Sequence, residues 1–146
     1  MRMYLIFILF TTILITGCST VGSKYQNQTA TKIVAQVNPS HIERQSIKTL
    51  TSSFHNSSSS PFSGAIVEIT GEVVAFALSE NNLYTVTISD DGDEAVCVFD
   101  DSISGKLGDG REIYSDATIT VRGQCAASGL FSSTAFSLNG CRLVSN

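Results

Sequence analysis

The feature that most constrains the fold is a two-residue alternation of apolar and polar side chains in the second half of the chain. In its first occurrence, Val67, Ile69 and Val73 share one face of an extended segment. Glu68 and Glu72 share the opposite face. Successive side chains of a β-strand point to opposite sides of the sheet, so this pattern is typical of a strand with one buried and one solvated face. The pattern predicts a mainly β fold.

Four more segments have strand character, and clusters of turn-forming residues separate them. After Val73 the apolar parity shifts, as a bulge or sharp bend would produce, so one long strand is expected to serve two sheets. The stretch 100–114 contains three glycines, with Ile103 and Leu107 spaced for a single helical turn. The expected strands cover residues 67–78, 83–89, 95–99, 117–123 and 134–144.

The order of these elements is three strands, a short helical connection between strands 3 and 4, and two more strands. This is the order of a small closed Greek-key barrel of the OB type, whose first strand is bent. We therefore predict a five-stranded OB-type Greek-key barrel over residues 62–146. The chain before it divides into a signal peptide over 1–17 and a polar tether over 18–61.

The first eighteen residues match a lipoprotein export signal. Arg2 supplies a positive start, residues 4–15 are apolar apart from two threonines, and Gly17 and Cys18 end the segment. An apolar run of about 12 residues is shorter than the roughly 20 that a membrane-spanning helix needs, so a cleaved signal peptide is the better interpretation. The alternative, an ordinary signal peptide that contains Cys18 by chance, lacks an equally good cleavage site nearby. We expect cleavage between Gly17 and Cys18.

Lipidation of Cys18 follows from the chemistry of such a signal. The thiol is the nucleophile that takes the diacylglyceryl group, and small Thr16 and Gly17 give the processing enzymes access. Each buried methylene of a fatty acyl chain such as palmitate contributes about 0.8 kcal/mol, so three chains anchor the protein firmly. Ser19 follows the cysteine, which in Gram-negative lipoproteins favours the outer membrane. We expect a location on its periplasmic face, with the inner membrane as the less favoured alternative.

The stretch from Cys18 to residue 61 is expected to be a lipidated tether. It is polar with no sustained hydrophobic period up to about residue 37, and it ends in a serine-rich run. Within it, Ser40 and Glu43 form the pattern of a helix cap, and apolar residues follow at helical spacing. Residues 41–54 could form a short helix or continue the tether, and both alternatives are open.

The charge is unevenly distributed between the tether and the barrel. Residues 19–61 hold four basic residues against one acid, a net charge of +3. Residues 62–146 hold four basic residues against twelve acids, a net charge of −8. An acidic domain repels phosphate backbones, and the second and third strands offer Tyr84 and Phe99 but no Lys or Arg. We therefore expect no nucleic-acid partner. The basic tether could lie along anionic lipid or fold onto the acidic barrel, and both options are open.

Three cysteines remain once Cys18 is committed to lipid: Cys97, Cys125 and Cys141. In an oxidising periplasm, three thiols favour one disulfide and one leftover thiol. Which two of the three would pair is open, and the alternative is three buried thiols that act as small hydrophobic side chains. There is no CxxC pair, so neither a thioredoxin-like redox site nor a zinc site is indicated.

Other chemistry-bearing residues form no pattern of a metal or catalytic site. The acids of the 90–94 turn do not have the spacing of a calcium loop, so a solvated turn is the simpler interpretation. His41 and His55 both fall in the expected tether, and no GxSxG elbow occurs. We expect no metal, no cofactor and no enzymatic activity.

Several of these segments together resemble the tRNA_anti-like family of OB-fold proteins, many of which are short secreted lipoproteins. The resemblance covers residues 62–144 and departs from the family pattern at Ala127-Ser128, where a glycine is usual. It implies a barrel and no reaction, because the family is largely uncharacterised. The motifs that carry it are Phe62-x-Gly64, Val67-x-Ile69-Thr70-Gly71-x-Val73, Val96-Cys97-Val98-Phe99, Ile119-x-Val121-x-Gly123-x-Cys125 and Phe136-x-Leu138-x-x-Cys141.

Taken together, the sequence predicts a membrane-anchored lipoprotein that presents an acidic OB-type barrel in the periplasm. Its expected work is binding of an unknown protein or envelope component. The alternative is a structural or assembly subunit of an envelope complex, and binding of nucleic acid or oligosaccharide is less favoured. A binding protein should expose an aromatic or apolar patch on the barrel.

Overall fold

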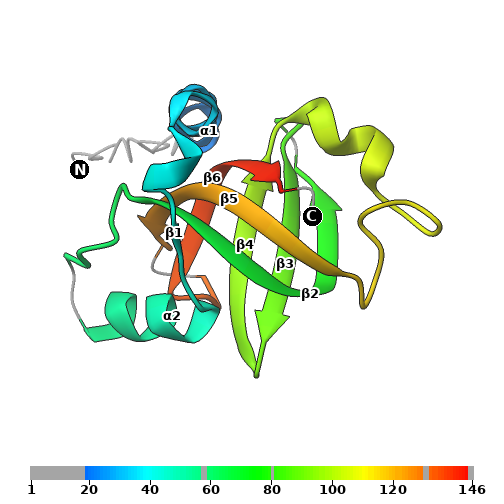
Figure 1. Cartoon of the computed structure of the whole chain (residues 1–146). Coiled ribbons are helices and arrows are strands. Elements are labelled where there is room, and N and C mark those ends of the chain that lie inside the picture. Colours follow the sequence, from blue (N-terminus) through cyan, green and yellow to red (C-terminus); the bar gives the residue numbers. More distant parts are fainter. Residues whose placement is uncertain (1–18, 57–58, 80, 130–131, 145–146) are drawn as a thin grey trace, which may run out of the picture.

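The computed structural model contains the predicted five-stranded OB-type barrel (Figure 1). It describes residues 19–56, 59–79, 81–129 and 132–144, so the expected signal peptide and Cys18 lie outside the described residues. The strands are hydrogen-bonded in the order β2-β3-β4-β6-β5, and a further pairing between β2 and β5 closes the barrel. The barrel strands are β2 (Ile66–Leu78), β3 (Tyr84–Asp90), β4 (Asp93–Phe99), β5 (Thr118–Ala127) and β6 (Phe136–Leu143).

The long strand β2 bends as predicted and contributes to both sides of the barrel. Its first half pairs with β5 and its second half with β3, and the register with β3 shifts between Val73 and Ala75. At Gly71 an added Cβ would lie 2.8 Å from the carbonyl oxygen of Ser89. Only glycine permits this close approach of two backbones, which is what the bend requires.

The barrel interior is filled by the alternating apolar side chains, and helix α2 (Ile47–Asn56) covers one end. Ile47 and Leu50 of α2 are fully buried, and the ring of Phe54 stacks on that of Phe136 with 5.7 Å between centroids. Of the two alternatives left open for residues 41–54, a short helix is therefore the one found, and it spans Ile47–Asn56. A 3₁₀ turn, η1 (Pro39–His41), and a two-residue strand, β1 (Glu43–Arg44), occupy the positions before it.

The connection between the third and fourth barrel strands contains the expected helical turn, η2 (Asp101–Lys106). The side chain of Asp100 caps it by accepting a hydrogen bond from the N–H of Ser102 at 3.0 Å. Ile103 and Ile113 are buried in the core, so this connection is part of the packed domain.

The expected tether is the main error of the sequence analysis, because residues 19–36 form helix α1 (Ser19–Gln36), which packs across β6 and β5. The buried stripe of α1 is Asn27, Ala30 and Val34, which is one face of a helix. The side chain of Asn27 accepts a hydrogen bond from the N–H of Gly140 at 2.7 Å. A polar and a small residue make this contact, so no strong hydrophobic period marks the helix in the sequence.

The contact between α1 and β6 is so close that it requires a glycine. Gly140 has φ of +63°, and an added Cβ would clash with the backbone of Ala30 and Thr31. The first part of the basic N-terminal segment therefore folds onto the barrel. Contact of this segment with anionic lipid stays a prediction. No helix in the described part of the chain is long and apolar enough to span a membrane.

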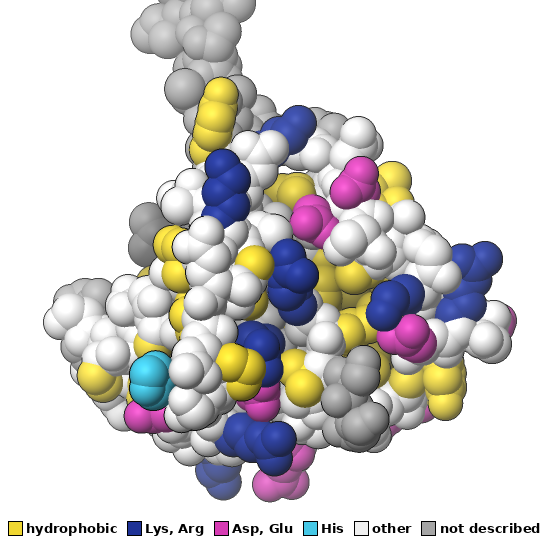
Figure 2. Space-filling view, turned by 45° about the horizontal axis from the view of Figure 1, so that its top comes forward, with side chains coloured by type: hydrophobic (Ala, Val, Ile, Leu, Met, Phe, Trp, Pro, Cys, Tyr) yellow, Lys and Arg dark blue, Asp and Glu magenta, His cyan; other side chains and the backbone are white. Residues whose placement is uncertain are grey.

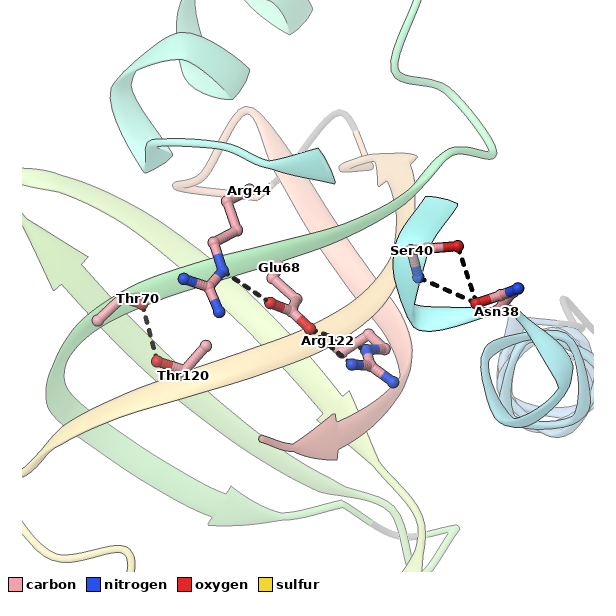
Figure 3. A network of polar contacts seen from close by, with 7 residues as sticks. All are labelled: Asn38, Ser40, Arg44, Glu68, Thr70, Thr120 and Arg122. Carbon is pink, nitrogen blue, oxygen red and sulfur yellow. Dashed lines mark hydrogen bonds and ion pairs between the residues drawn. The ribbon is translucent and has the colours of Figure 1, made fainter. Parts of the chain in front are cut away.

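Strand β1 ties a second part of the expected tether to the barrel. It pairs with β2 in parallel, and the N–H of Gln45 donates to the carbonyl of Glu68 at 2.9 Å. The carboxylate of Glu68 lies between two guanidinium groups, at 2.6 Å from Arg122 and 3.2 Å from Arg44 (Figure 3). Hydrogen bonds from Arg122, opposed by burial and helped by Arg44, hold the pKa of Glu68 below its usual value.

Candidate functional site

Neither histidine nor the acidic turn forms a site in the described residues. His41 lies on η1 and His55 on α2, and both are exposed. The acidic turn is a two-residue β-hairpin between β3 and β4, in which Asp91 and Gly92 have positive φ. This is the geometry that aspartate and glycine favour in tight hairpins, so the acids there have a structural explanation. No group of three or more potential metal ligands occurs in the described part of the chain.

The three cysteines of the barrel are free thiols, and the predicted disulfide is absent from the structure. Cys97 on β4 and Cys125 on β5 both lie beside Leu138 of the intervening strand β6. Two strand spacings, about 9–10 Å, therefore separate their backbones. A disulfide needs Cα atoms within about 7 Å. The Sγ of Cys141 donates to the carbonyl of Leu138 at 3.2 Å and also lies close to the thiol of Cys97, but no disulfide joins the two thiols.

Burial suppresses the reactivity of these thiols. Burial and the adjacent Cys97 raise the pKa of Cys125 to about 12. Burial and a hydrogen bond with Cys97 raise the pKa of Cys141 well above its ordinary value. Since the thiolate is the nucleophile and the metal ligand, these residues act as small core side chains. This is the alternative that the sequence analysis kept open.

Lys and Arg side chains gather on the face of the molecule that carries α1 (Figure 2). Exposed Lys24 and Lys32 lie on α1, and Arg122 of β5 pairs with Arg142 of β6. Glu68 accepts hydrogen bonds from Arg122 and Arg44, so one carboxylate neutralises part of the positive charge of this face. The opposite charges of the two halves of the sequence are thus brought together in one folded unit.

A shallow groove of about 730 Å³ lies between α1 and the outer surface of β4, β5 and β6. Its lining is uncharged and includes an exposed tyrosine, two valines and the amide and hydroxyl groups of several short side chains. Tyr25, Val96, Val98, Gln124, Ser137 and Asn139 are among these residues. Val96 and Val98 of this lining are half-buried, whereas Tyr25 of α1 is 66% exposed.

The most distinctive surface of the barrel is the outer half of β2, residues 74–78, which we call the β2 edge. All five residues are exposed, and none carries a charge. The large apolar side chains Val74, Phe76 and Leu78 expose 46%, 42% and 58% of their surface. Tyr114, 45% exposed, lies two residues before Asp116, whose N–H donates to the carbonyl of Val73 at the start of the edge. Contiguous exposed apolar side chains mark interaction surfaces.

Sequence reasoning missed this edge and selected two other aromatic residues. Phe99 is completely buried and Tyr84 is half-buried, so neither forms the open stacking platform considered for the second and third strands. Conversely, Val74, Phe76 and Leu78 alternate like the buried face of a strand. Their exposure arises because β5 pairs with β2 only as far as Glu72. The apolar alternation of Val74, Phe76 and Leu78 is visible in the sequence. The sequence does not show that β5 stops pairing with β2 before these residues, which leaves them exposed.

Comparison with known proteins agrees with this architecture. The tRNA_anti-like family model matches residues 1–141. A structure described as an aspartyl-tRNA synthetase from Leishmania major Friedlin aligns with a TM-score of 0.52 and 11% identity, over 72% of this chain and 20% of that one. The asparaginyl-tRNA synthetase of Entamoeba histolytica aligns with a TM-score of 0.42 and 13% identity, over 56% of this chain and 21% of that one.

The chain spans about a fifth of the length of these two synthetases. At such low identity the likeness concerns the fold alone. No curated protein matches the sequence.

Proposed function

The chain belongs to the tRNA_anti-like family, and on that basis we propose that it is a membrane-anchored lipoprotein whose OB-type barrel binds a protein of the bacterial envelope. In this proposal the signal peptide ends at Gly17 and Cys18 carries the lipid. The barrel then works in the periplasm, at the inner surface of the outer membrane.

The packing of α1 supports a close association with the bilayer. The helix begins at Ser19, directly after Cys18, and its buried stripe fixes it to β6. An acylated Cys18 would therefore hold the barrel near the lipid surface through a helix, and not on a long flexible tether. The Lys and Arg side chains on the α1 face suit a location near anionic lipid.

The observation that carries the binding proposal is the β2 edge. It supplies the exposed apolar patch expected of a binding protein, with Val74, Phe76 and Leu78 on one strand. Its side chains provide no acid, base or nucleophile, so the surface is suited to recognition and not to catalysis. The second candidate, an assembly subunit of an envelope complex, would use the same patch but would be found in fixed stoichiometry with its complex.

Photo-cross-linking in intact cells tests this proposal. A photoreactive amino acid replaces Tyr114 beside the β2 edge, or Tyr25 on α1 as the control position, which is 66% exposed. We expect a discrete protein adduct from position 114 and not from position 25. Substitution of Cys18→Ser should release the protein from the membrane fraction and weaken that adduct.

Two outcomes would contradict the proposal. Equal adducts from positions 114 and 25, or none from either, would show that the edge is not a preferred contact surface. Retention of the Cys18→Ser variant in the membrane fraction would show that lipid on this cysteine is not the anchor.

A further inference from the structure

We infer that the β2 edge binds its partner by strand addition, and that the partner is an extended segment with alternating apolar residues and Lys or Arg at its ends. This inference rests on the proposed protein-binding function and specifies its site and the chemistry of the partner. In strand addition, main-chain hydrogen bonds provide much of the affinity, and side-chain contacts at alternate positions provide the specificity.

The backbone of β2 is open on one side over residues 74–78. Pairing of β2 with β5 ends at Glu72 and Thr118, and Val73 then exchanges hydrogen bonds of 2.9 Å with Ala117 and Asp116. From there to Leu78, the only described strand that pairs with β2 is β3. One side of five consecutive residues is therefore without a described partner strand. The pairing of β4 with β6 is also short, but among the described barrel strands only β2 exposes large apolar side chains.

The register shows which residues turn their peptide groups toward the open side. The N–H of Ser79 donates to the carbonyl of Leu83 at 2.8 Å, which makes this a hydrogen-bonded pair of the hairpin. Hydrogen-bonded and non-hydrogen-bonded pairs alternate along an antiparallel ladder. Ala77 and Ala75 therefore bond to β3, whereas the peptide groups of Phe76 and Leu78 point away from it. An incoming strand would meet the main-chain groups of these two residues.

The side chains of the edge are apolar and uncharged. Natural proteins commonly protect an open edge with charged side chains, a proline or a bulge that twists it away. Between Val74 and Leu78 the sequence is Val-Ala-Phe-Ala-Leu, with no charge and no proline. The register shift lies at the start of this stretch and leaves the remainder paired regularly with β3. The edge thus retains the features of a template for another strand.

The charges at the two ends of the edge distinguish between possible occupants. Exposed Glu72 and Asp116 lie at the start of the edge, and the sequence places Glu80 just after it. Antiparallel pairing of two copies about Phe76 would set Glu72 opposite residue 80, which is also glutamate. Parallel pairing in register would set Glu72 beside itself. Like charges on directly opposed residues destabilise a sheet, so a second copy is disfavoured and a strand with basic ends is favoured.

Binding of designed peptides to the mature chain tests this inference. The protein carries Cys18→Ser and keeps every described residue, and it is labelled with ¹⁵N for NMR. The first peptide has three valines that alternate with two threonines and an arginine at each end. The second is identical except for glutamates at its ends. We expect the arginine peptide to shift the amide signals of residues 74–78 most, and to bind at least tenfold more tightly than the glutamate peptide.

Two variants show whether the edge itself is responsible. Phe76→Lys places a charge on the edge and should abolish binding, whereas Ile33→Lys, at an apolar residue of α1 that is 39% exposed, should not. Glu72→Lys leaves the apolar stretch intact and should reduce or reverse the preference for the arginine peptide. Unchanged signals from the barrel core in each variant confirm that it is folded.

Shifts confined to another surface, equal affinity for both peptides, no binding, or binding that survives Phe76→Lys would each overturn the inference. These results are distinguishable from failure of the proposed function. A specific adduct from position 114 with no strand addition would leave the function in place and remove the mode of binding. Strand addition of the designed peptide without an adduct in cells would support the mode of binding and contradict the proposed function.

Discussion

At the scale of single residues, Glu68 shows how this fold ties its N-terminal segment to the barrel. Its carboxylate is buried at 6% exposure, while one of its partners, Arg44, has a side chain that is 84% exposed. The less exposed Arg122 makes the shorter contact and is the first cause of the lowered pKa. Since exposed ion pairs contribute little, most of the stabilisation should come from Arg122.

The substitution Glu68→Gln should destabilise the protein. It keeps the shape of the side chain but removes the charge, which leaves Arg122 without its ionic partner. Hydrogen bonds to charged groups contribute on the order of 1.5–3 kcal/mol, so we expect a loss of about that size in the free energy of unfolding. Denaturant unfolding measures it, with Glu43→Gln on exposed β1 as the matched control. Equal stability of the two variants would contradict the role given to Glu68.

The same carboxylate should make stability depend on pH in the acid range. Because the pKa of Glu68 is lower in the folded state, its contribution is fully present above the unfolded value of about 4.5 and is lost as pH falls through the folded value. The stability difference between the wild type and Glu68→Gln should therefore be constant near pH 7 and shrink below about pH 4.5. A difference that persists unchanged at pH 3 would contradict this assignment.

Counting the free thiols of the protein tests whether any two of its barrel cysteines form a disulfide. In the Cys18→Ser chain, Cys97, Cys125 and Cys141 should not react with Ellman's reagent at pH 8 while the protein is folded, because all three side chains are buried away from the reagent. Burial also raises the pKa of Cys125 and Cys141. After unfolding in denaturant without reductant, all three should react. A count of one thiol in the unfolded protein would show that two of the cysteines form a disulfide.

At the scale of elements, α1 explains what the sequence could and could not predict. The alternating strands, the bend of β2 and the turn between β4 and β5 followed from periodicity and glycine placement. Helix α1 did not, because its contact with β6 uses Asn27, Ala30 and a glycine in place of large apolar residues. Such a contact depends on close backbone approach, which leaves little trace in a hydrophobic pattern. The exposure of the β2 edge could not be predicted either, because it depends on where the pairing of β5 with β2 ends.

A pair of glycine substitutions should isolate the contact of α1 with the barrel. Gly140→Ala and Gly64→Ala both place a side chain at positive φ, which costs about 1–2 kcal/mol. Only the first also drives a Cβ against α1, because nothing lies within 4 Å of a Cβ at Gly64. We expect Gly140→Ala to be clearly less stable and to lose hydrogen-exchange protection in α1. Similar behaviour of the two variants would mean that α1 is only loosely attached.

At the scale of the whole molecule, the structure is a closed barrel with an open apolar edge on β2. Helix α2 covers one end, α1 lies across β5 and β6, and the barrel strands form a continuous ring. Beyond Val73, β2 has no described partner strand on one side, and this edge is apolar. Anchoring through Cys18 and recognition at the β2 edge would place these two activities on separate parts of the molecule.

The most direct test of this account is amide hydrogen exchange of the Cys18→Ser chain, read residue by residue by NMR. The account predicts alternation along the β2 edge. The amides of Ala75 and Ala77, bonded to β3, should be protected, whereas those of Phe76 and Leu78 should exchange at least a hundredfold faster. Uniform protection of all four amides would show that the edge is already paired or covered, and would contradict the central claim that it is open to a partner strand.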